Sequence, residues 1–251
     1  MSFPTYVPTP TQERELWRIV QPYKLESLLS GDLWFVRIDS FGDPREGDLP
    51  TKNLGLLAKG PKYASEWLTN EYAKNKLISY AICLTRSDCG PKQYLWDHFS
   101  KPEETIAIRT SVAAVNEAIS PFSKIGMPVQ FGNVEYIDHS TETIVEDNLI
   151  RAVYTVDKEW EKECEARVLL YLSGTVTSNL YYSGTSIIKS PIQRSRGHWT
   201  GTDNHRKAII ARIDPEKFIH EIRLHPRMSP NDRILVLGII SRFNMKHKLR
   251  P

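Results

Sequence analysis

The sequence predicts an α+β fold in a single domain, with a mixed, mostly antiparallel sheet and flanking helices. Three observations predict it. Strand-like and helix-like segments follow one another without a regular βαβ rhythm. The 251 residues show no linker, and this length fits one large domain at residues 13–251 after a flexible lead-in at residues 1–12. Hydrophobic residues make up 40% and charged residues 25%, which suits a globular chain that buries its own core.

Proline and glycine divide the first part of the chain into short elements. Pro22 suits the first turn of a helix, and Gly31 suits its C-terminal end. Leu25, Leu28 and Leu29 share one face of that helix. The expected elements are, in order, a strand at Glu15–Val20, a helix from Pro22 to Gly31, a strand at Leu33–Ile38, a turn at Phe41–Pro44 and a long loop over residues 42–60.

Apolar spacing and capping residues predict the elements of the remaining chain. Tyr63, Trp67 and Tyr72 recur at near-helical spacing after Pro61, and Ser229 is a strong helix cap. The expected helices cover residues 61–75, 93–100, 111–119, 140–152 and 230–240, with a short helical turn after residue 214. The expected strands cover residues 77–85, 105–110, 129–138 with a glycine interruption, 162–171, 208–214 and 220–226, with further strands and turns over residues 171–190.

Composition limits the class of protein. A net charge of +3 with a pI near 8.6 is too mild to indicate nucleic acid by itself. Cys83, Cys89 and Cys164 have no zinc-site spacing, so a reducing cytosol is the simplest compartment. The N-terminus lacks the pattern of a signal peptide, and the apolar run Ile234–Ile240 is far too short to span a membrane. We expect a cytoplasmic protein without a membrane partner or a metal site.

The stretch "WEKECEARVLLY" holds the most distinctive charged pattern. If residues 162–171 form a strand, Glu163, Glu165 and Arg167 point to one face. Two carboxylates about 7 Å apart repel each other, so one of them can have the raised pKa of a general base or of a ribose anchor. Arg167 can neutralise its neighbour. The alternative is an exposed strand face with an internal ion pair.

Several basic and aromatic residues are candidates for ligand binding. Arg18 lies inside an apolar strand, where it either faces solvent or binds a phosphate or carboxylate in a pocket. Arg37 follows Leu33 and Phe35 at alternate positions of its strand. Trp96 in "WDHFS" either packs in the core or contacts a ligand together with Arg109. The candidates for ligand binding are therefore Arg18, Arg37, Trp96, Arg109 and Arg167.

The loop "RSRGHWTGTDNHRK" is the candidate for nucleic-acid or anion binding. Arg194, Arg196 and Arg206 surround Trp199, a combination that fits contact with phosphate or with single-stranded nucleic acid. A solvated basic loop is the alternative. The chain contains no Walker, GxGxxG, HExxH, GxSxG or zinc pattern, so the commonest ATPase, dinucleotide-fold and hydrolase functions have no support.

The order of these motifs resembles the bacterial domain of unknown function 2971 family. The family's late Glu-x-Glu-x-Arg signature is matched by Glu163, Glu165 and Arg167. The resemblance covers most of residues 16–240 and is carried by the blocks "LWRIV…LESLLSGDLWFVRIDSFGDPREG", "CLT…YLWDHFSKPEETIAIRT", "VEY", "KEWEKECEARVLL" and "EIRLHP". The chain departs from the family in having Gly42 for asparagine, Phe99 for tyrosine and an acidic stretch reduced to Asp88.

More distantly, the chain is similar to the ADP-ribosyltransferase fold. That resemblance implies that Arg18 grips the nicotinamide nucleotide and that Glu163 or Glu165 orients the ribose at an oxocarbenium-like transition state. It also implies that Arg18 and Glu165 face one cleft, and a structure with the two residues on opposite faces of the sheet would contradict it. No residue is assigned to the fold's middle catalytic element. The fold implies NAD as the substrate and a role as a toxin or an anti-phage effector.

We therefore rank three classes of function. The first is an ADP-ribosyltransferase-like enzyme that uses NAD. The second is a binding module without catalysis that recognises nucleic acid or an anionic ligand. The third is a metal-dependent nuclease, for which Asp39, Asp43 and the Glu163–Glu165 pair are the only carboxylate candidates.

Overall fold

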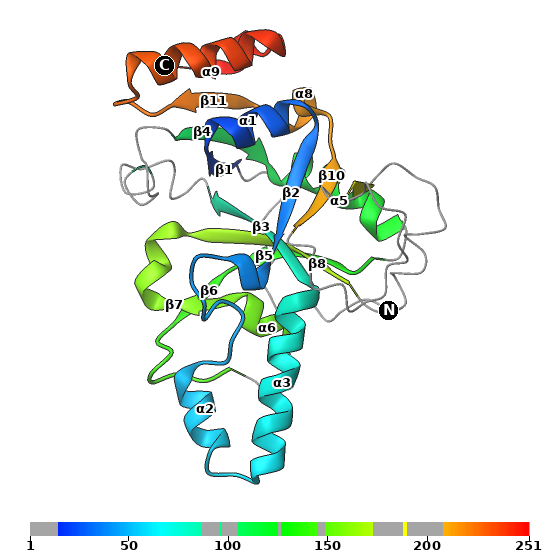
Figure 1. Cartoon of the computed structure of the whole chain (residues 1–251), viewed down its shortest axis with the longest axis vertical. Helices are drawn as coiled ribbons and strands as arrows, with labels where there is room; N and C mark the ends of the chain where they lie inside the picture. The colour runs from blue at the N-terminus through cyan, green and yellow to red at the C-terminus, as the bar shows by residue number, and fades with distance from the viewer. Residues whose placement is uncertain are drawn as a thin grey trace.

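A branched, mostly antiparallel sheet forms the centre of the molecule in the computed structural model (Figure 1). The structure describes residues 15–86, 96, 105–124, 127–144, 149–172, 188–189 and 208–250. Within these residues, ten strands form the main sheet and two more form a small second sheet. The α+β class with a mixed, mostly antiparallel sheet is confirmed.

The elements follow the chain without a repeating unit. The strands are β1 (Glu15–Val20), β2 (Asp32–Arg37), β3 (Ser79–Arg86), β4 (Ile106–Ser111), β5 (Val129–Asn133), β6 (Glu135–Ile137), β7 (Thr155–Asp157), β8 (Glu165–Tyr171), β9 (Ile188–Lys189), β10 (Ala208–Arg212), β11 (Glu221–Leu224) and β12 (Leu249–Arg250). The α-helices are α1 (Pro22–Leu29), α2 (Thr51–Leu57), α3 (Lys62–Ile78), α5 (Val112–Lys124), α6 (Leu149–Val153), α8 (Pro215–Phe218) and α9 (Pro230–Arg242). Short 3-10 turns are η1 (Ile38–Ser40), η3 (Lys158–Glu163) and η4 (Lys246–Lys248).

Strand β3 is the branch point of the sheet. Its whole length pairs with β8 on one edge, from Ser79 opposite Tyr171 to Thr85 opposite Glu165. The other edge is shared, because β2 pairs with the beginning of β3 and β1 pairs with its end. In the described residues no strand pairs with Ile82–Leu84 on that second edge. The sheet therefore opens between β1 and β2, beside the middle of β3.

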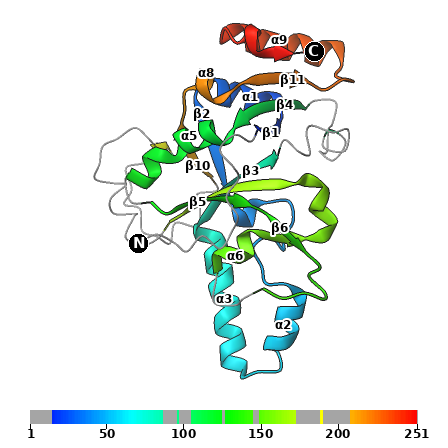
Figure 2. The same cartoon turned by 180° about the vertical axis from the view of Figure 1, so that it is seen from behind.

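Two hydrophobic clusters lie on opposite faces of the sheet. The main core packs one face, including Leu84 of β3 and Val168 of β8, against helices α1, α5 and α9. A smaller cluster covers the other face, where Ala81 and Leu169 meet Tyr154. Figures 1 and 2 show α9 at one end of the molecule and the pair α2 and α3 projecting from the other end.

Local sequence explains several element boundaries. Pro22 occupies the first turn of α1, and Gly31 follows it with a positive φ of 86° that favours glycine. Ser229 caps α9, where its side-chain oxygen accepts the Asp232 backbone N–H at 3.1 Å. None of the helices in the described part of the chain has the length and apolar character needed to traverse a lipid bilayer.

Several predicted elements differ from the structure. Residues 42–60 are not one loop, because α2 forms inside them. Its buried Asn53 exchanges hydrogen bonds of 2.9 and 3.0 Å with the Ile144 backbone, a contact that local sequence does not show. The predicted strand over residues 129–138 is two strands, β5 and β6, with different partners. Of the predicted helix over residues 140–152, the described part is helical only from Leu149.

Candidate functional site

Arg167 is the centre of a buried ion-pair cluster. Its Nε and Nη2 donate to the two carboxylate oxygens of Glu165 at 2.7 and 3.0 Å, and its Nη1 donates to Glu46 at 2.6 Å and to the Val153 backbone oxygen. The Phe41 ring lies 5.5 Å from the guanidinium carbon. Burial lowers the pKa of Arg167, but the charges of Glu165 and Glu46 raise it well above its usual value. The pair formed by Glu165 and Arg167 is therefore fixed and fully enclosed.

Glu163 does not lie on the strand with Glu165, which corrects the predicted alternation. Strand β8 begins only at Glu165, and Glu163 ends the turn η3. Between them Cys164 has a left-handed backbone with a φ of 46°, which breaks the strand geometry. Cys164 is also disulfide-bonded, which differs from the reduced state that the sparse cysteines predict.

Glu163 still belongs electrostatically to the cluster. Burial raises its pKa to about 7, with a further contribution from the charge of Glu165, while Arg167 acts in the opposite direction. Burial also raises the pKa of Glu46, against the effect of Arg167. Ionising all three carboxyl groups around one guanidinium costs free energy because their charges repel. The three groups together therefore retain a proton near neutral pH. A carboxyl group with such a pKa suits general acid–base chemistry.

The Cys83 thiol and the Tyr136 hydroxyl border the same cluster. Burial raises the pKa of Cys83 well above its usual value, and the neighbouring Glu165 adds to the effect. The thiol is therefore protonated at neutral pH and unsuited to act as a nucleophile. The Tyr136 hydroxyl accepts the backbone N–H of Glu165 at 2.7 Å. Burial raises the pKa of Tyr136 as well.

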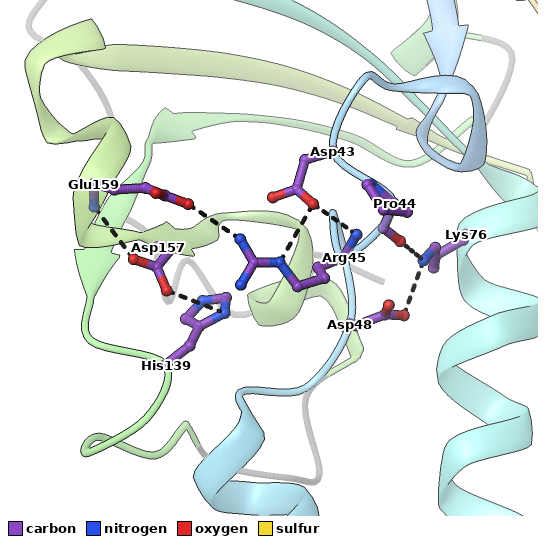
Figure 3. Close-up of polar contacts among 8 residues, drawn as sticks. All are labelled: Asp43, Pro44, Arg45, Asp48, Lys76, His139, Asp157 and Glu159. Atoms are coloured by element: carbon purple, nitrogen blue, oxygen red, sulfur yellow. Dashed lines mark hydrogen bonds and ion pairs between the residues drawn. The ribbon is translucent and has the colours of Figure 1, made fainter.

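The loop of residues 41–50 brings Glu46 to the cluster. Figure 3 shows Arg45, the neighbour of Glu46, lying between Asp43 and Glu159. Arg45 Nη2 donates to Glu159 at 3.1 Å, and Glu159 belongs to η3, the turn that ends at Glu163. The Asp157 side chain starts this turn by accepting the Glu159 backbone N–H. The ion pair of Arg45 and Glu159 thus joins the segment that carries Glu46 to the segment that carries Glu163.

A second set of contacts fastens the loop to α3 (Figure 3). Lys76 Nζ donates to Asp48 and to the Pro44 backbone oxygen, both at 2.9 Å. Beneath the loop, His139 is 7% exposed, and its Nδ1 lies 4.0 Å from a carboxylate oxygen of Asp157. Burial lowers the pKa of His139, so the ring is neutral at neutral pH. The loop is therefore held from two sides while Glu46 points inward to Arg167.

Arg18 lines a pocket where the sheet opens. The cavity has a volume of about 250 Å³ and lies between β1, α1 and β2. Among the described residues, the Arg18 guanidinium has no hydrogen-bond or ion-pair partner. Burial lowers the pKa of Arg18 to about 10, which leaves the group charged at neutral pH. A charged guanidinium without a partner in a pocket is suited to bind a phosphate or carboxylate.

The walls of the pocket add a second cation and an aromatic face. Burial lowers the pKa of Lys24, and the nearby Arg18 lowers it further. Trp34 is fixed because its indole N–H donates to the Ser27 hydroxyl oxygen at 2.6 Å. Asp32, the acidic residue among those that line the pocket, is paired with an arginine of β10. The pocket is therefore lined by two cations and an indole ring.

Strand alternation places Arg18 and Glu165 on opposite faces of the sheet, so the prediction that they face one cleft is wrong. Trp17 lies opposite Thr85, and Thr85 lies opposite Glu165, so these three share a face. Arg18 points to the other face. The Cys83 thiol acts electrostatically on both Arg18 and Glu165. Cys83, in the middle of β3, is thus an electrostatic neighbour of both residues.

The other predicted ligand-binding residues are engaged elsewhere. Arg37 is paired with Asp39 at 2.6 Å, and this hydrogen bond raises its pKa. Arg109 forms an ion pair with Glu221 at 2.8 Å. Trp96 packs in a small cluster with Trp17 and Ala107, as its alternative interpretation expects. None of the three lines the Arg18 pocket.

Two further predictions concern metal and nucleic acid. Among the described residues, no three His, Cys, Asp or Glu side chains are grouped so that they could hold a metal ion. Asp39 and Asp43, the carboxylates of the nuclease hypothesis, are paired with Arg37 and Arg45. The basic loop with Arg194, Arg196, Trp199 and Arg206 lies outside the described residues.

Sequence reasoning missed three members of these sites. Glu46 is 121 positions from Arg167 and carries no local signal. Lys24 and Trp34 were assigned only to a helix and a strand, although each follows Arg18 closely in sequence.

The chain matches no known family and no curated protein. It is similar to solved structures of Thermus sp. 2.9 DarT in complex with ADP-ribosylated ssDNA (14% identity, TM-score 0.35, covering 98% of this chain and 95% of that chain) and in complex with NAD+ (15%, 0.34, 97% and 94%). The complex with carba-NAD+ gives 14% identity and a TM-score of 0.32, covering 96% and 94%. TM-scores below 0.5 establish neither a shared fold nor a shared function, and the family resemblance stays a prediction.

Proposed function

We propose that this chain is an ADP-ribosyltransferase-like enzyme that uses NAD. The observation that supports the proposal most is Arg18, a charged guanidinium without a partner among the described residues, in a pocket at the opening of the sheet. Arg18 and Lys24 suit the pyrophosphate of a dinucleotide, and the fixed face of Trp34 suits a heteroaromatic ring. The volume of about 250 Å³ accommodates part of such a ligand.

Glu163 is the proposed acid–base group. NAD supplies an ADP-ribosyl group bonded to nicotinamide, which departs with the electron pair of the broken glycosidic bond. With its pKa raised to about 7, Glu163 is partly ionised at neutral pH and can accept the proton that the acceptor loses when it bonds to the ribose. Glu165, held by Arg167 on the other face of the sheet from Arg18, raises the pKa of Glu163 through its charge.

The test is the release of nicotinamide from NAD, followed by chromatography. We expect Glu163→Gln to lower the rate by about 100-fold or more, the usual contribution of a general acid or base. Arg18→Gln should raise KM by about tenfold or more, because it removes a charged hydrogen-bond donor. Glu161→Gln and Arg233→Gln, which change exposed residues, are the matched controls and should behave as the parent chain does.

Two results separate the alternatives. If Arg18→Gln and Glu163→Gln consume NAD at the parent rate, the proposed site is wrong. If the parent chain binds NAD or another nucleotide through Arg18 and releases no nicotinamide, the function is ligand binding without catalysis. That outcome would favour the second class of function, because the pocket alone suffices for it.

A further inference from the structure

The helical pair α2 and α3 carries four exposed apolar side chains near its end. Tyr63 and Trp67 are 77% and 63% exposed, and they are one helical turn apart on α3. Leu54 and Leu56 of α2 are 41% and 50% exposed. Exposed leucines and a tryptophan so close in sequence are unusual on the surface of a folded domain, where such patches mark contact sites. We call these four residues the hairpin tip.

The hairpin around the tip is basic. Residues 51–78 contain five lysines and two glutamates. Both glutamates are paired within α3, Glu66 with Lys62 at 3.6 Å and Glu71 with Lys74 at 2.7 Å. Lys59, in the turn between the helices, has no carboxylate partner among the described residues. Lys76 is paired with Asp48, so Lys59 is the positive charge that lies beside the exposed apolar side chains in the turn.

We propose that the hairpin tip docks on an anionic lipid surface. The tip combines the side chains that favour a membrane interface: tryptophan and tyrosine at the headgroup level, leucine for the acyl boundary and lysine for anionic headgroups. Figures 1 and 2 show the pair projecting at the end of the molecule opposite α9, so the tip can reach a flat surface first. This differs from the sequence-based expectation of no membrane partner.

The shape of the tip favours a lipid surface over a strand of nucleic acid or a protein partner. A strand of nucleic acid is bound in a basic groove that follows its backbone, and a projecting end offers no such groove. A stable protein partner requires about 800 Å² on each side, more than four side chains at the end of a hairpin present. A lipid interface requires only a few inserted side chains and nearby positive charge.

The test is co-sedimentation of the full chain with vesicles at low salt. The vesicles are phosphatidylcholine alone, or phosphatidylcholine and phosphatidylserine in equal parts. We expect binding to the mixed vesicles, weakening at high salt and in Lys59→Glu. The double variant Trp67→Ala, Leu56→Ser should bind about tenfold less. Leu235→Ser, at an exposed leucine of α9 at the far end, is the matched control and should bind as the parent does.

Three results would overturn the proposal. The first is a parent chain that does not sediment with the mixed vesicles. The second is equal loss of binding in Leu235→Ser and in the double variant. The third is a double variant that keeps vesicle binding but loses binding to a single-stranded oligonucleotide or loses self-association, which would assign the tip to nucleic acid or to a second copy. Because these residues are exposed, thermal unfolding should be nearly unchanged in every variant.

Discussion

Replacing Glu163 with glutamine tests the electrostatics of the carboxylate cluster without any assay of activity. The structure raises the pKa of Glu163 from 4.5 to about 7. A group with a raised pKa in the folded state contributes stability that is fully present below its unfolded pKa. That stability is lost as pH rises through the folded pKa. The parent chain should therefore lose stability between about pH 4.5 and pH 7 through Glu163, and Glu163→Gln should not.

The magnitude of the stability change follows from the pKa shift of Glu163. Each pKa unit corresponds to about 1.4 kcal/mol, so the shift sets an upper bound of about 3 kcal/mol. Because Glu163 is only partly buried, solvent screening reduces the expected effect to about 1.5 kcal/mol. Urea unfolding at about pH 5 and about pH 8 measures it, and groups common to both chains cancel in the difference.

The free energy of unfolding at about pH 8 tests this reasoning. Relative to the parent, Glu163→Gln should gain stability between the two pH values, while Glu161→Gln, an exposed residue of the same turn, should not. A difference that stays constant with pH would refute the reasoning. So would a glutamine variant that becomes less stable relative to the parent at about pH 8.

Three further predictions concern the scaffold of the site. Arg167→Met should cost about 3–5 kcal/mol in urea unfolding, because it leaves Glu165 and Glu46 buried without a cation; a loss below about 1 kcal/mol would contradict this. Arg45→Gln breaks an exposed ion pair and should cost less than about 1 kcal/mol, yet amide hydrogen exchange in the loop of residues 41–50 should become faster; unchanged exchange would show that the pair does not hold the loop. Gly47→Ala should lower stability by more than about 1 kcal/mol, since φ is 75° and the new methyl would lie 3.0 Å from a neighbouring side-chain carbon; a neutral result in thermal unfolding would argue against this loop conformation.

Much of the fold could be predicted where residues close in sequence mark the ends of a helix or strand. The first strand, helix and second strand follow from Pro22, Gly31 and alternating apolar residues, and α9 follows from its serine cap. Helix α2 was missed because the contact that involves its buried Asn53 comes from residue 144, far along the chain. The division of residues 129–138 into two strands was missed for the same reason, because β7 draws β6 into a second sheet.

The candidate site shows the same division between local and distant information. Residue type and spacing identified Glu165 and Arg167 as a pair on one strand face, and the structure joins them by two hydrogen bonds. The left-handed backbone of Cys164 places Glu163 outside that strand. A cysteine does not predict this conformation, which glycine and asparagine adopt more readily. Glu46 comes from a distant loop, so only the tertiary structure could reveal it.

Calorimetric titration of NAD into the parent chain and into Arg18→Gln tests the central claim most directly. The account predicts one binding site in the parent chain, an affinity at least about tenfold weaker in Arg18→Gln, and parent-like binding in Arg233→Gln. The affinity should also fall as salt is raised, because the ligand is an anion. Equal affinity in all three chains, or no binding of NAD to the parent chain, would contradict the account.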